Sequence, residues 1–578
     1  MRRRGPHAAP SMSSAAALVF PCVFATALVF SGAAVAPQGA AARTDTPASR
    51  GPGGADPAPS VPPPSAAASG TTSASSVDER GHRLLLDGKA AEAARLYAEA
   101  ISADPSDRIA MAGRIRALIV QDLWKEALSE ARRFAASLPG YPESAAPVPP
   151  PPEAVSQAQD GPSAQTAPAS PLRRSGNADV LTALGEALYR AGLIPEAART
   201  LEPIAAVASP PARALLFLGL SRAAEGRDAE AAELLARASS SDPDDRDILF
   251  RAAGAAPTRA RAVQMLEAYL ARCAGDDPDR IEGARGTIRL YRALGERPVW
   301  VPDARPPRVE IPMWPLRDRS GGLRGFVIEM TVPQGRPIRL LLDTGSSGLF
   351  LVERIAARAG FSVLSEETVF AGGGDAHQAT RRGLFSAVGF GPVSFKDALA
   401  SVTIEEIEAT GLYHGGVGPS VFAGYSVTLD LPRARLVLEK ETGQAQGSPY
   451  WDVEGQMLVE AGTGGGARGL FLLDTGATSS VLSESFALLD PAARLGDPAS
   501  VRAFGGPLRG SRSLRGVTLR FQGLETQAGS ALRATDLTQR SRLGGVEVAG
   551  FLGLDLLERA TITVAPRARR VAVLAGRK

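Results

Sequence analysis

The residues of this chain whose types and spacing could do chemistry are two copies of the tripeptide Asp-Thr-Gly. Asp343-Thr344-Gly345 ends the stretch LLLDTG, and Asp474-Thr475-Gly476 ends the stretch FLLDTG 131 residues later. A single Asp-Thr-Gly carries little information, because about 0.1 copies are expected by chance in a chain of this length. Here each copy follows three or four apolar residues at the same place in a duplicated unit. We therefore interpret the two aspartates as one functional pair.

A pair of aspartates has a well-defined chemistry. Two carboxylates held about 3 Å apart cannot both ionise easily, so they hold one proton between them at moderately acidic pH. The ionised member can take a proton from a water that attacks a peptide carbonyl, while the protonated member donates to the carbonyl oxygen. Glycine after Asp-Thr lets the backbone turn tightly, and the threonine hydroxyl can hydrogen-bond across a symmetric interface. This chemistry needs no covalent intermediate, metal or cofactor, and we predict none.

The duplication extends well beyond the tripeptide. In both halves a strand, a tight turn and a second apolar strand lead into it: FVIEMTVPQGRPIRLLLDTG and QMLVEAGTGGGARGLFLLDTG. Both halves also close alike, so that Gly418 pairs with Gly553 and Pro432–Arg435 pairs with Pro566–Arg569. The apolar residues have strand-like spacing. We therefore predict two similar β units in tandem, each supplying one carboxylate to a shared site.

At these residues the sequence resembles the aspartic protease family. DTGSSGLFL, residues 343–351, looks like the N-terminal lobe of pepsin-like enzymes, and DTGATS, residues 474–479, resembles the retroviral version. VAGFLGLDLL, residues 548–557, resembles the apolar-apolar-Gly loop that braces the catalytic strand in this family. The resemblance implies an all-β, bilobal acid-protease barrel with lobes at 309–442 and 447–578.

The resemblance also implies a role for each residue of the two motifs. The aspartates would form the catalytic dyad, the threonines a clamp across the lobes, and the glycines the backbone turn. The serine after the first motif would hydrogen-bond the outer oxygen of the first aspartate. The residues concerned are Asp343, Thr344, Gly345, Ser346, Asp474, Thr475 and Gly476.

The sequence departs from the family pattern in the first half and in the loops. The first bracing loop reads GGVGPS, with only Val417 apolar before Gly418, which predicts a weaker brace. Ala477 lacks the hydroxyl that Ser346 offers, as in retroviral-type enzymes. A flap that covers substrate should lie between each Asp-Thr-Gly and its closing loop. The candidates are VFAGGGDAHQ, with Phe370, Gly372, Gly373 and Gly374, and in the second half RAFGGPLRG, residues 502–510.

The N-terminal half has helical patterning with a period of 34 residues, the length of one helix-turn-helix unit in stacked repeat proteins. The pattern resembles tetratricopeptide (TPR) repeats, and Gly185 recurs one period later as Gly219. We predict at least four such repeats, in an all-α solenoid over 77–143 and 176–296. Generic Ala-rich helices are the alternative. The matching residues of the first unit are Gly81, Leu84, Ala93, Tyr97, Ala100 and Pro105.

Segments outside these two parts have other compositions. Residues 1–42 carry Arg2–Arg4, an apolar run and small residues, which indicates a signal peptide or an uncleaved membrane anchor. We therefore predict an exported protein, periplasmic or secreted, and the abundance of Arg, Ala, Gly and Pro suggests a GC-rich bacterial genome. Residues 43–76 and 144–175 are rich in Pro, Ala and Ser and are predicted to be disordered linkers. Residues 297–308 are predicted to form a Pro-rich hinge.

Composition argues against several other classes of function. The formal charge of +3 comes without a dense basic cluster interleaved with aromatic residues, so we predict no nucleic-acid partner. The four histidines show no metal-ligand spacing, so we predict no metal. The G-x-G-x-x-G in GTGGGARG leads into a strand and not into a helix, as dinucleotide binding requires, so it is interpreted as a hairpin turn.

The sequence thus predicts an aspartic endopeptidase that hydrolyses peptide or protein substrates and is preceded by repeats that dock a protein partner or the substrate. Stacked helical repeats give a concave binding surface, and a β-rich cleft can pair with an extended peptide backbone. The alternative is a non-catalytic peptide-binding or scaffold protein that has kept the barrel without turnover.

Overall fold

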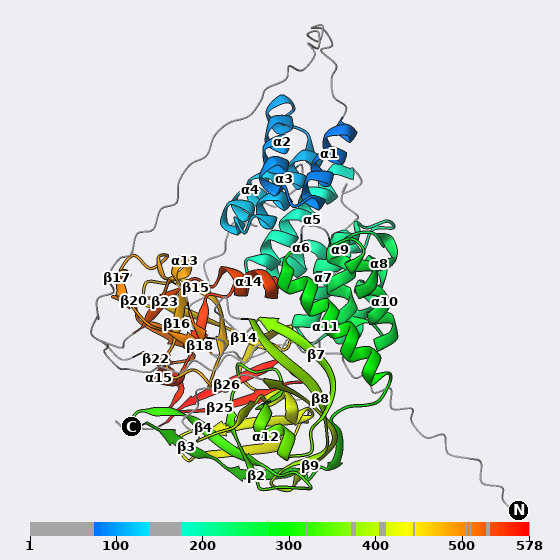
Figure 1. Cartoon of the computed structure of the whole chain (residues 1–578). Coiled ribbons are helices and arrows are strands. Elements are labelled where there is room, and N and C mark those ends of the chain that lie inside the picture. The colour runs from blue at the N-terminus through cyan, green and yellow to red at the C-terminus, as the bar shows by residue number, and fades with distance from the viewer. Residues whose placement is uncertain are drawn as a thin grey trace, which may run out of the picture.

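The fold combines a helical part with a β part (Figure 1). The predicted signal peptide or anchor, 1–42, and nearly all of the predicted linkers lie outside the described residues, so export and anchoring stay predictions. Within the described ranges no helix is long and apolar enough to cross a membrane. The predicted fold class is confirmed: an all-α repeat solenoid precedes an all-β bilobal part. The computed structural model describes residues 74–138, 175–273, 276–318, 321–370, 377–403, 412–442, 445–503, 506–508, 510–526 and 532–576.

The helical part is built of paired helices that follow the predicted period. The first helix starts at Ala74, inside the segment predicted as a linker, because Val77 packs beside Leu84 and Leu85 in the first small core. The helices are α1 (Ala74–Leu86), α2 (Ala90–Ala103), α3 (Arg108–Val120), α4 (Trp124–Ala136), α5 (Ser175–Arg190), α6 (Ile194–Ala205), α7 (Ala212–Ala224), α8 (Asp228–Ser241), α9 (Arg246–Ala252), α10 (Arg259–Leu270) and α11 (Pro278–Leu294).

Small residues let the helices of the repeats approach closely. A Cβ atom at Gly81 or at Gly113 would lie 2.3 Å from the ring of Tyr97, so only glycine fits on either side of this buried side chain. The same close approach recurs at Gly185, where a Cβ atom would lie 2.4 Å from Leu201. The glycines that marked the period in the sequence are therefore helix-packing positions, which generic Ala-rich helices would not require.

The β part contains two runs of strands, one for each half of the duplication. The first run holds β1 (Val301–Ala304), β2 (Arg308–Pro312), β3 (Trp314–Arg317), β4 (Leu323–Met330), β5 (Ile338–Leu342), β6 (Leu349–Val352), β7 (Ser362–Phe370), β8 (His377–Phe390), β9 (Val393–Thr403), β10 (Gly415–Val417), β11 (Tyr425–Asp430) and β12 (Arg435–Lys440), with helix α12 (Glu353–Arg358). The second run holds β13 (Ser448–Val453), β14 (Gln456–Thr463), β15 (Arg468–Leu473), β16 (Val481–Ser483), β17 (Arg494–Pro498), β18 (Arg502–Ala503), β19 (Gly506–Pro507), β20 (Arg512–Arg515), β21 (Leu519–Phe521), β22 (Leu524–Glu525), β23 (Arg533–Thr535), β24 (Gly550–Leu552), β25 (Ala560–Ala565) and β26 (Arg570–Ala575), with helices α13 (Glu484–Ala487), α14 (Thr538–Gly544) and α15 (Leu554–Leu557).

The order of strands repeats between the two lobes. The first lobe has the order β4-β5-β10-β6-β9-β8-β7, and the second has β14-β15-β24-β16-β23-β20-β17. In both lobes the third strand of this series runs parallel to the second and antiparallel to the fourth. The duplication seen in the sequence is therefore a duplication of topology, and a pseudo-two-fold axis relates the lobes.

A shared sheet joins the lobes across this axis. Its strand order is β2-β12-β11-β25-β26-β13, and the central pair, β11 and β25, is antiparallel. Thr428 lies opposite Thr563, and their hydroxyl oxygens are 3.0 Å apart. The β11–β12 hairpin and the β25–β26 hairpin close the two lobes, and each has a four-residue loop between its strands. Equivalent residues of the two hairpins are therefore 135 positions apart. The predicted pairing of Pro432 with Pro566 is therefore wrong by one residue, and Leu431 is the structural counterpart of Pro566.

The segment predicted as a hinge, 297–308, contains strand β1. Strand β1 pairs with β9 at the side of the first lobe, and the Trp300 N–H donates to the Asp397 oxygen at 2.9 Å. The Trp300 ring packs edge-on against Phe395, with the ring centres 5.5 Å apart. Prolines are tolerated in such an edge strand because one side of it needs no ladder hydrogen bond. The segment therefore attaches the helical part to the first lobe.

The helical part also packs on the second lobe. Arg190, at the end of α5, is buried, donates to the Ser541 oxygen in α14 and pairs with Asp122 at 2.8 Å. The Arg190 carbonyl accepts from the Glu547 N–H at 2.7 Å. Leu470 of β15 belongs to the same apolar core as the helices. The repeats and the second lobe therefore share one core.

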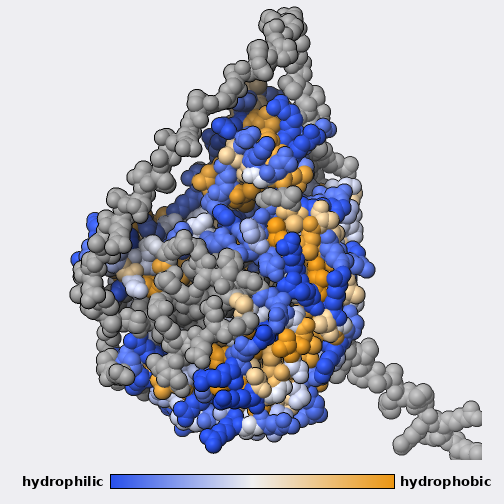
Figure 2. Space-filling model, viewed as in Figure 1, coloured by the Kyte–Doolittle hydropathy of each residue, from blue (hydrophilic) through white to orange (hydrophobic). Residues whose placement is uncertain are grey.

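The surface of the repeats, the cavity wall included, exposes apolar side chains between hydrophilic ones. Figure 2 shows these side chains in strips over the helical part, while hydrophilic residues cover much of the visible surface. The large exposed apolar residues of the repeats include Leu86, Ile109, Val120, Leu123 and Val207.

Candidate active site

The two motif aspartates directly follow the second strand of the series described above, β5 in one lobe and β15 in the other. Beside each of these strands runs the parallel brace strand, β10 or β24. The Asp343 N–H donates to the Val417 oxygen at 3.0 Å, and the Asp474 N–H donates to the Leu552 oxygen at 3.0 Å. The two lobes therefore hold their aspartates by the same backbone hydrogen bond.

The glycine-rich brace of the first lobe is packed by an aromatic residue from the neighbouring strand. Gly416 in β10 lies opposite Phe350 in β6, and a Cβ atom at Gly416 would lie 2.3 Å from the phenyl ring. In the second lobe the aromatic residue is on the brace itself, where Phe551 lies opposite Val481. Both phenyl rings are fully buried. The predicted weaker brace is therefore wrong, because the two lobes fill the equivalent space from opposite strands.

The two threonines form hydrogen bonds across the lobes, as the resemblance implied. The Thr344 hydroxyl accepts from the Thr475 N–H at 2.9 Å and donates to the Leu473 oxygen at 2.7 Å. The Thr475 hydroxyl accepts from the Thr344 N–H at 3.2 Å and donates to the Leu342 oxygen at 2.8 Å. All these groups are buried, so the four bonds lie out of competition with water.

Each carboxyl lies against the glycine of the other motif. Asp343 and Asp474 are 0% exposed. The Gly345 N–H donates to Asp343 Oδ1 at 2.8 Å, and the Gly476 N–H donates to Asp474 Oδ1 at 2.9 Å. A Cβ atom at Gly345 would lie 2.9 Å from the Asp474 carboxyl carbon, and one at Gly476 would lie 2.7 Å from that of Asp343. Only glycine leaves room for the two carboxyls to meet at the axis.

The second oxygen of each carboxyl accepts no hydrogen bond from a group outside the pair. Asp343 Oδ2 and Asp474 Oδ2 have no hydrogen-bond partner among the described residues. The predicted bond from the Ser346 hydroxyl to the outer oxygen of Asp343 is therefore wrong. Backbone amides of the turn face the carboxyl instead, and the Ser346 N–H donates to the Asp343 carbonyl oxygen at 3.1 Å. In the second lobe the Ala477 N–H gives Asp474 Oδ1 a further bond of 2.9 Å. Both Oδ2 atoms are buried and keep an unused hydrogen-bonding capacity.

The surroundings of the carboxyls favour their protonated form. Burial raises the pKa of Asp343 to about 7. Two hydrogen bonds, one from the Gly345 N–H and one with Asp474, act in the opposite direction and lower this pKa. Burial also raises the pKa of Asp474 well above its usual range, and the charge of Asp343 raises it further. Two carboxyls this close titrate as one unit. The pair therefore holds a proton at pH values where an exposed aspartate, with a pKa of about 4, is ionised.

The strands that flank the two flap candidates occupy equivalent places in the strand order of the lobes. Phe370 is the last residue of β7, which pairs with β8, whereas Gly372, Gly373 and Gly374 lie outside the described residues. In the second lobe, 502–510 lies between β17 and β20, the counterparts of β7 and β8 in the strand order. The β18 and β19 strands within it pair with each other. Contact of either segment with substrate stays a prediction.

The sequence interpretation missed two side chains beside the site. Asp555 accepts from the Ser480 N–H at 2.8 Å and from its hydroxyl at 2.7 Å, and that hydroxyl accepts from the Gly553 N–H at 3.0 Å. These bonds tie the loop after the second aspartate to the brace. Burial, with the nearby charge of Asp343, raises the pKa of Tyr413 to about 12. Asp555 could have been found as the acidic residue in an otherwise apolar motif, but no sequence signal marked Tyr413.

Comparison with known proteins found one matching family and solved structures of low identity. Residues 328–413, which include Asp343, match the aspartyl protease family. An aspartic proteinase from Irpex lacteus is 14% identical, with a TM-score of 0.31, over 46% of this chain and 97% of its own. A thermophilic TPR protein from Thermus thermophilus is 19% identical, with a TM-score of 0.26, over 37% of this chain and 99% of its own. No curated protein matches the chain.

The C-terminal part is aspartyl-protease-like, and the helices before it are TPR-like. The matched range carries the first aspartate, while the second is brought to it by the duplicated topology. Among the residues that the structure describes, no group of three or more His, Cys, Asp or Glu side chains is placed to hold a metal ion.

Replacing Thr344 by valine should destabilise the folded chain. Thr344→Val keeps the side-chain shape but leaves the buried Thr475 N–H and the Leu473 oxygen without partners, each costing about 1–3 kcal/mol. We expect a loss of about 3 kcal/mol in the free energy of unfolding, measured by urea denaturation of the full chain. Thr344→Ser keeps the hydroxyl and is the control. Equal stability of the two variants would contradict the assigned hydrogen bonds.

The buried dyad should make the protein less stable as pH rises. A carboxyl whose folded-state pKa is raised contributes stability that is complete below its unfolded pKa of about 4 and is lost as pH rises through the folded value. For Asp343 that value is about 7. Asp343→Asn cannot ionise, so its stability relative to wild type should increase from pH 4 to pH 8, as followed by urea midpoints. The same change at exposed Asp87 should produce no such trend, and a constant difference for Asp343→Asn would contradict the buried-dyad assignment.

Proposed function

We propose that the chain is an aspartic endopeptidase of the retropepsin and pepsin type in which Asp343 and Asp474 form the catalytic dyad. The observation that carries the proposal is the position of the two carboxyls. Each is fully buried and lies against the glycine of the opposite motif, and each keeps one oxygen without a hydrogen-bond partner from outside the pair. A purely structural pair would be expected to satisfy those oxygens, because unpaired buried polar atoms are costly.

The proposed reaction uses one proton shared by the dyad. The ionised carboxylate takes a proton from a water molecule as the water oxygen attacks the peptide carbonyl carbon, and the protonated carboxyl donates its proton to the carbonyl oxygen. The tetrahedral intermediate then collapses: the amide nitrogen takes a proton from the newly protonated carboxyl, one hydroxyl of the intermediate returns its proton to the other, ionised carboxylate, the C–N bond breaks, and the products are a carboxylic acid and an amine. The backbone amides of Gly345 and Gly476 hold each Oδ1 in place during both proton transfers.

The scaffold alternative receives no support from the site. It rested on the weak brace that the sequence predicted for the first lobe, and Phe350 provides the missing volume there. The backbone N–H of each aspartate donates to a carbonyl oxygen of its brace strand, and the N–O distance is 3.0 Å in both lobes. Both braces therefore hold their aspartate by the same backbone hydrogen bond.

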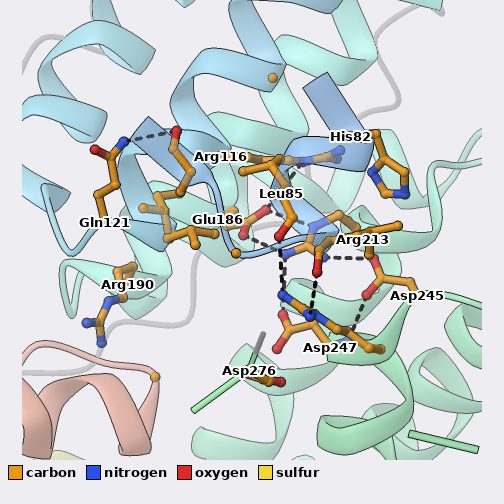
Figure 3. Close-up of a pocket in the computed structure, with 18 of the residues that line it drawn as sticks. His82, Leu85, Arg116, Gln121, Glu186, Arg190, Arg213, Asp245, Asp247 and Asp276 are labelled. Carbon is orange, nitrogen blue, oxygen red and sulfur yellow. Dashed lines mark hydrogen bonds and ion pairs between the residues drawn. The ribbon is translucent and has the colours of Figure 1, made fainter. Parts of the chain in front are cut away.

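The repeats are proposed to dock a protein partner or the substrate through a cavity of about 920 Å³. Its lining comes from α1, α2, α3, α5 and α7, from α9 and α11 with the turns before them, and from α14 of the second lobe. Figure 3 shows Arg213 between Glu186, Asp245 and Asp247 in its wall, and Arg213 Nη2 lies 2.6 Å from Glu186. The lining holds more carboxylates than guanidinium groups, so it attracts cationic groups.

The docking proposal predicts a preference for basic peptides. Asp78 and Asp179 line the cavity, and neither is close enough to an arginine of the described residues to form an ion pair. Lys- and Arg-containing peptides from a random library should be enriched on the immobilised full chain, and binding should weaken with added salt. Asp179→Asn should reduce this enrichment, whereas Asp87→Asn, at an exposed position outside the lining, should not. Enrichment of acidic peptides, or none, would contradict the proposal.

Cleavage of peptides should require both aspartates. The full chain, incubated with a diverse peptide mixture from pH 3 to 8, should produce cuts that mass spectrometry identifies. Asp343→Asn and Asp474→Asn should each reduce the rate by about 1,000-fold or more, because either amide removes the shared proton. Asp87→Asn should cut at the wild-type rate. The rate should fall as pH rises through about 7, where the raised pKa of Asp343 lies. A folded wild type that cuts nothing would exclude general endopeptidase activity.

A further inference from the structure

Helix α11, the last helix of the repeats, lies against the β7–β8 hairpin of the first lobe (Figure 1). β7 is the final strand of its sheet and pairs only with β8 among the described strands. The Arg289 side chain of α11 donates through Nε to the backbone oxygen of Glu366 in β7 at 3.0 Å. An edge strand covered in this way is held in place and protected from other pairing. The helical part therefore contacts the hairpin itself as well as the base of the lobe.

A close contact between helix and hairpin lies at Gly286. A Cβ atom at this position would lie 2.0 Å from Glu367 Oε2 and 3.0 Å from the Glu367 Cβ atom. A Cβ contact below 3.0 Å forces one partner to move, so only glycine permits this approach. Gly283, one turn earlier on the same helix, has open space where its Cβ atom would be. The two glycines therefore differ in their distance from the hairpin.

Glu367 is part of a buried ion pair within the hairpin. Its Oε1 lies 2.5 Å from Nε of Arg382 in β8, and the two side chains are 2% and 5% exposed. Breaking a buried pair leaves an uncompensated charge, which is costly. The backbone register places Glu367 opposite Thr380 and Arg382 opposite Ser365, so this pair bridges the two strands diagonally. Any shift of the Glu367 carboxylate therefore disturbs both arms of the hairpin.

The hairpin is continuous with the strands that hold Asp343. β8 pairs with β9, β9 with β6, β6 with the brace β10, and β10 with β5, which ends at the aspartate. The hairpin and the first aspartate thus belong to one sheet. A helix that fixes the outer strand of this sheet also fixes the hairpin relative to the site.

We propose that the helical repeats are part of the substrate-binding apparatus: α11, through Gly286 and the Glu367–Arg382 pair, positions the β7–β8 hairpin relative to Asp343, which follows a strand of the same sheet. Glu367 and Arg382 are positioning residues, because they touch no reacting atom and act through the hairpin. The proposal rests on the proposed endopeptidase function for its kinetic consequence. Its structural core, the attachment of the hairpin to α11, is independent of activity.

The test compares two substitutions on the same helix. Gly286→Ala and Gly283→Ala both replace glycine by alanine in α11, and both gain the same helix propensity. Only Gly286→Ala pushes against Glu367. In the full chain we expect Gly286→Ala to raise KM for a cleaved peptide by about 10-fold with kcat changed less than about 2-fold, since substrate positioning is weakened while the dyad is untouched. Gly283→Ala should match wild type in both constants.

Hydrogen exchange provides the second measurement. The amides of β7 and β8 should exchange faster in Gly286→Ala than in wild type or Gly283→Ala, while the amides of β14 and β15 should be unchanged. Glu367→Gln, which keeps the shape of the side chain but removes its charge, should show the same pattern. Glu367→Asp added to Gly286→Ala withdraws the carboxylate by one methylene and should restore part of the protection and of KM.

The outcomes separate this inference from the endopeptidase proposal. A wild type that cuts no peptide contradicts the endopeptidase proposal, while faster exchange of the hairpin in Gly286→Ala still supports the attachment. Wild-type exchange and wild-type KM in Gly286→Ala would overturn the positioning role. Equal effects of Gly286→Ala and Gly283→Ala would also overturn it, because they would show a general effect on α11.

Discussion

Two buried carboxyl groups that meet at an axis oppose their own ionisation, and the rest of the β part holds them in place. The cross-lobe threonine bonds, the paired braces and the shared sheet all converge on Asp343 and Asp474. The raised pKa of both groups is the physical sign of this arrangement, because burial penalises the charged form. The same penalty makes one shared proton available for acid and base chemistry.

The two lobes achieve the same support with different residues. In the first lobe Phe350 fills the space beside a glycine brace, and in the second lobe Phe551 fills it from the brace. Interiors are close-packed, so a change of volume on one strand must be balanced on its neighbour. This exchange allows the lobes to differ in sequence while the backbone hydrogen bond to each aspartate stays the same. The helical part adds contacts to both lobes, through Arg190 to α14 and through α11 to β7.

The sequence predicted those features that local patterns or the duplication specify. The helix pairs followed from a 34-residue period with glycine at the crossing points, and the threonine bonds followed from the repeated tripeptide. Three details depended on contacts between distant residues and were mispredicted. Phe350 lies 66 residues before the glycine that it packs against, the hairpin correspondence shifted by one residue because the loops are equal in length, and residues 301–304 of the predicted hinge formed a strand because β9 offered a partner. Asp555 and the Gly286–Glu367 contact likewise exist only in the folded chain.

The central claim is that the aspartates of the two lobes act as one unit, and a comparison of single and double variants tests it most directly. The peptide cleavage rates of Asp343→Asn, Asp474→Asn and the double variant are measured on one substrate at one pH. If the dyad shares one proton, the double variant should be no more than about 10-fold slower than the slower single variant, because the first amide already removes the function of the pair. A double variant that loses the product of the two single effects would show two independent roles and would contradict the account.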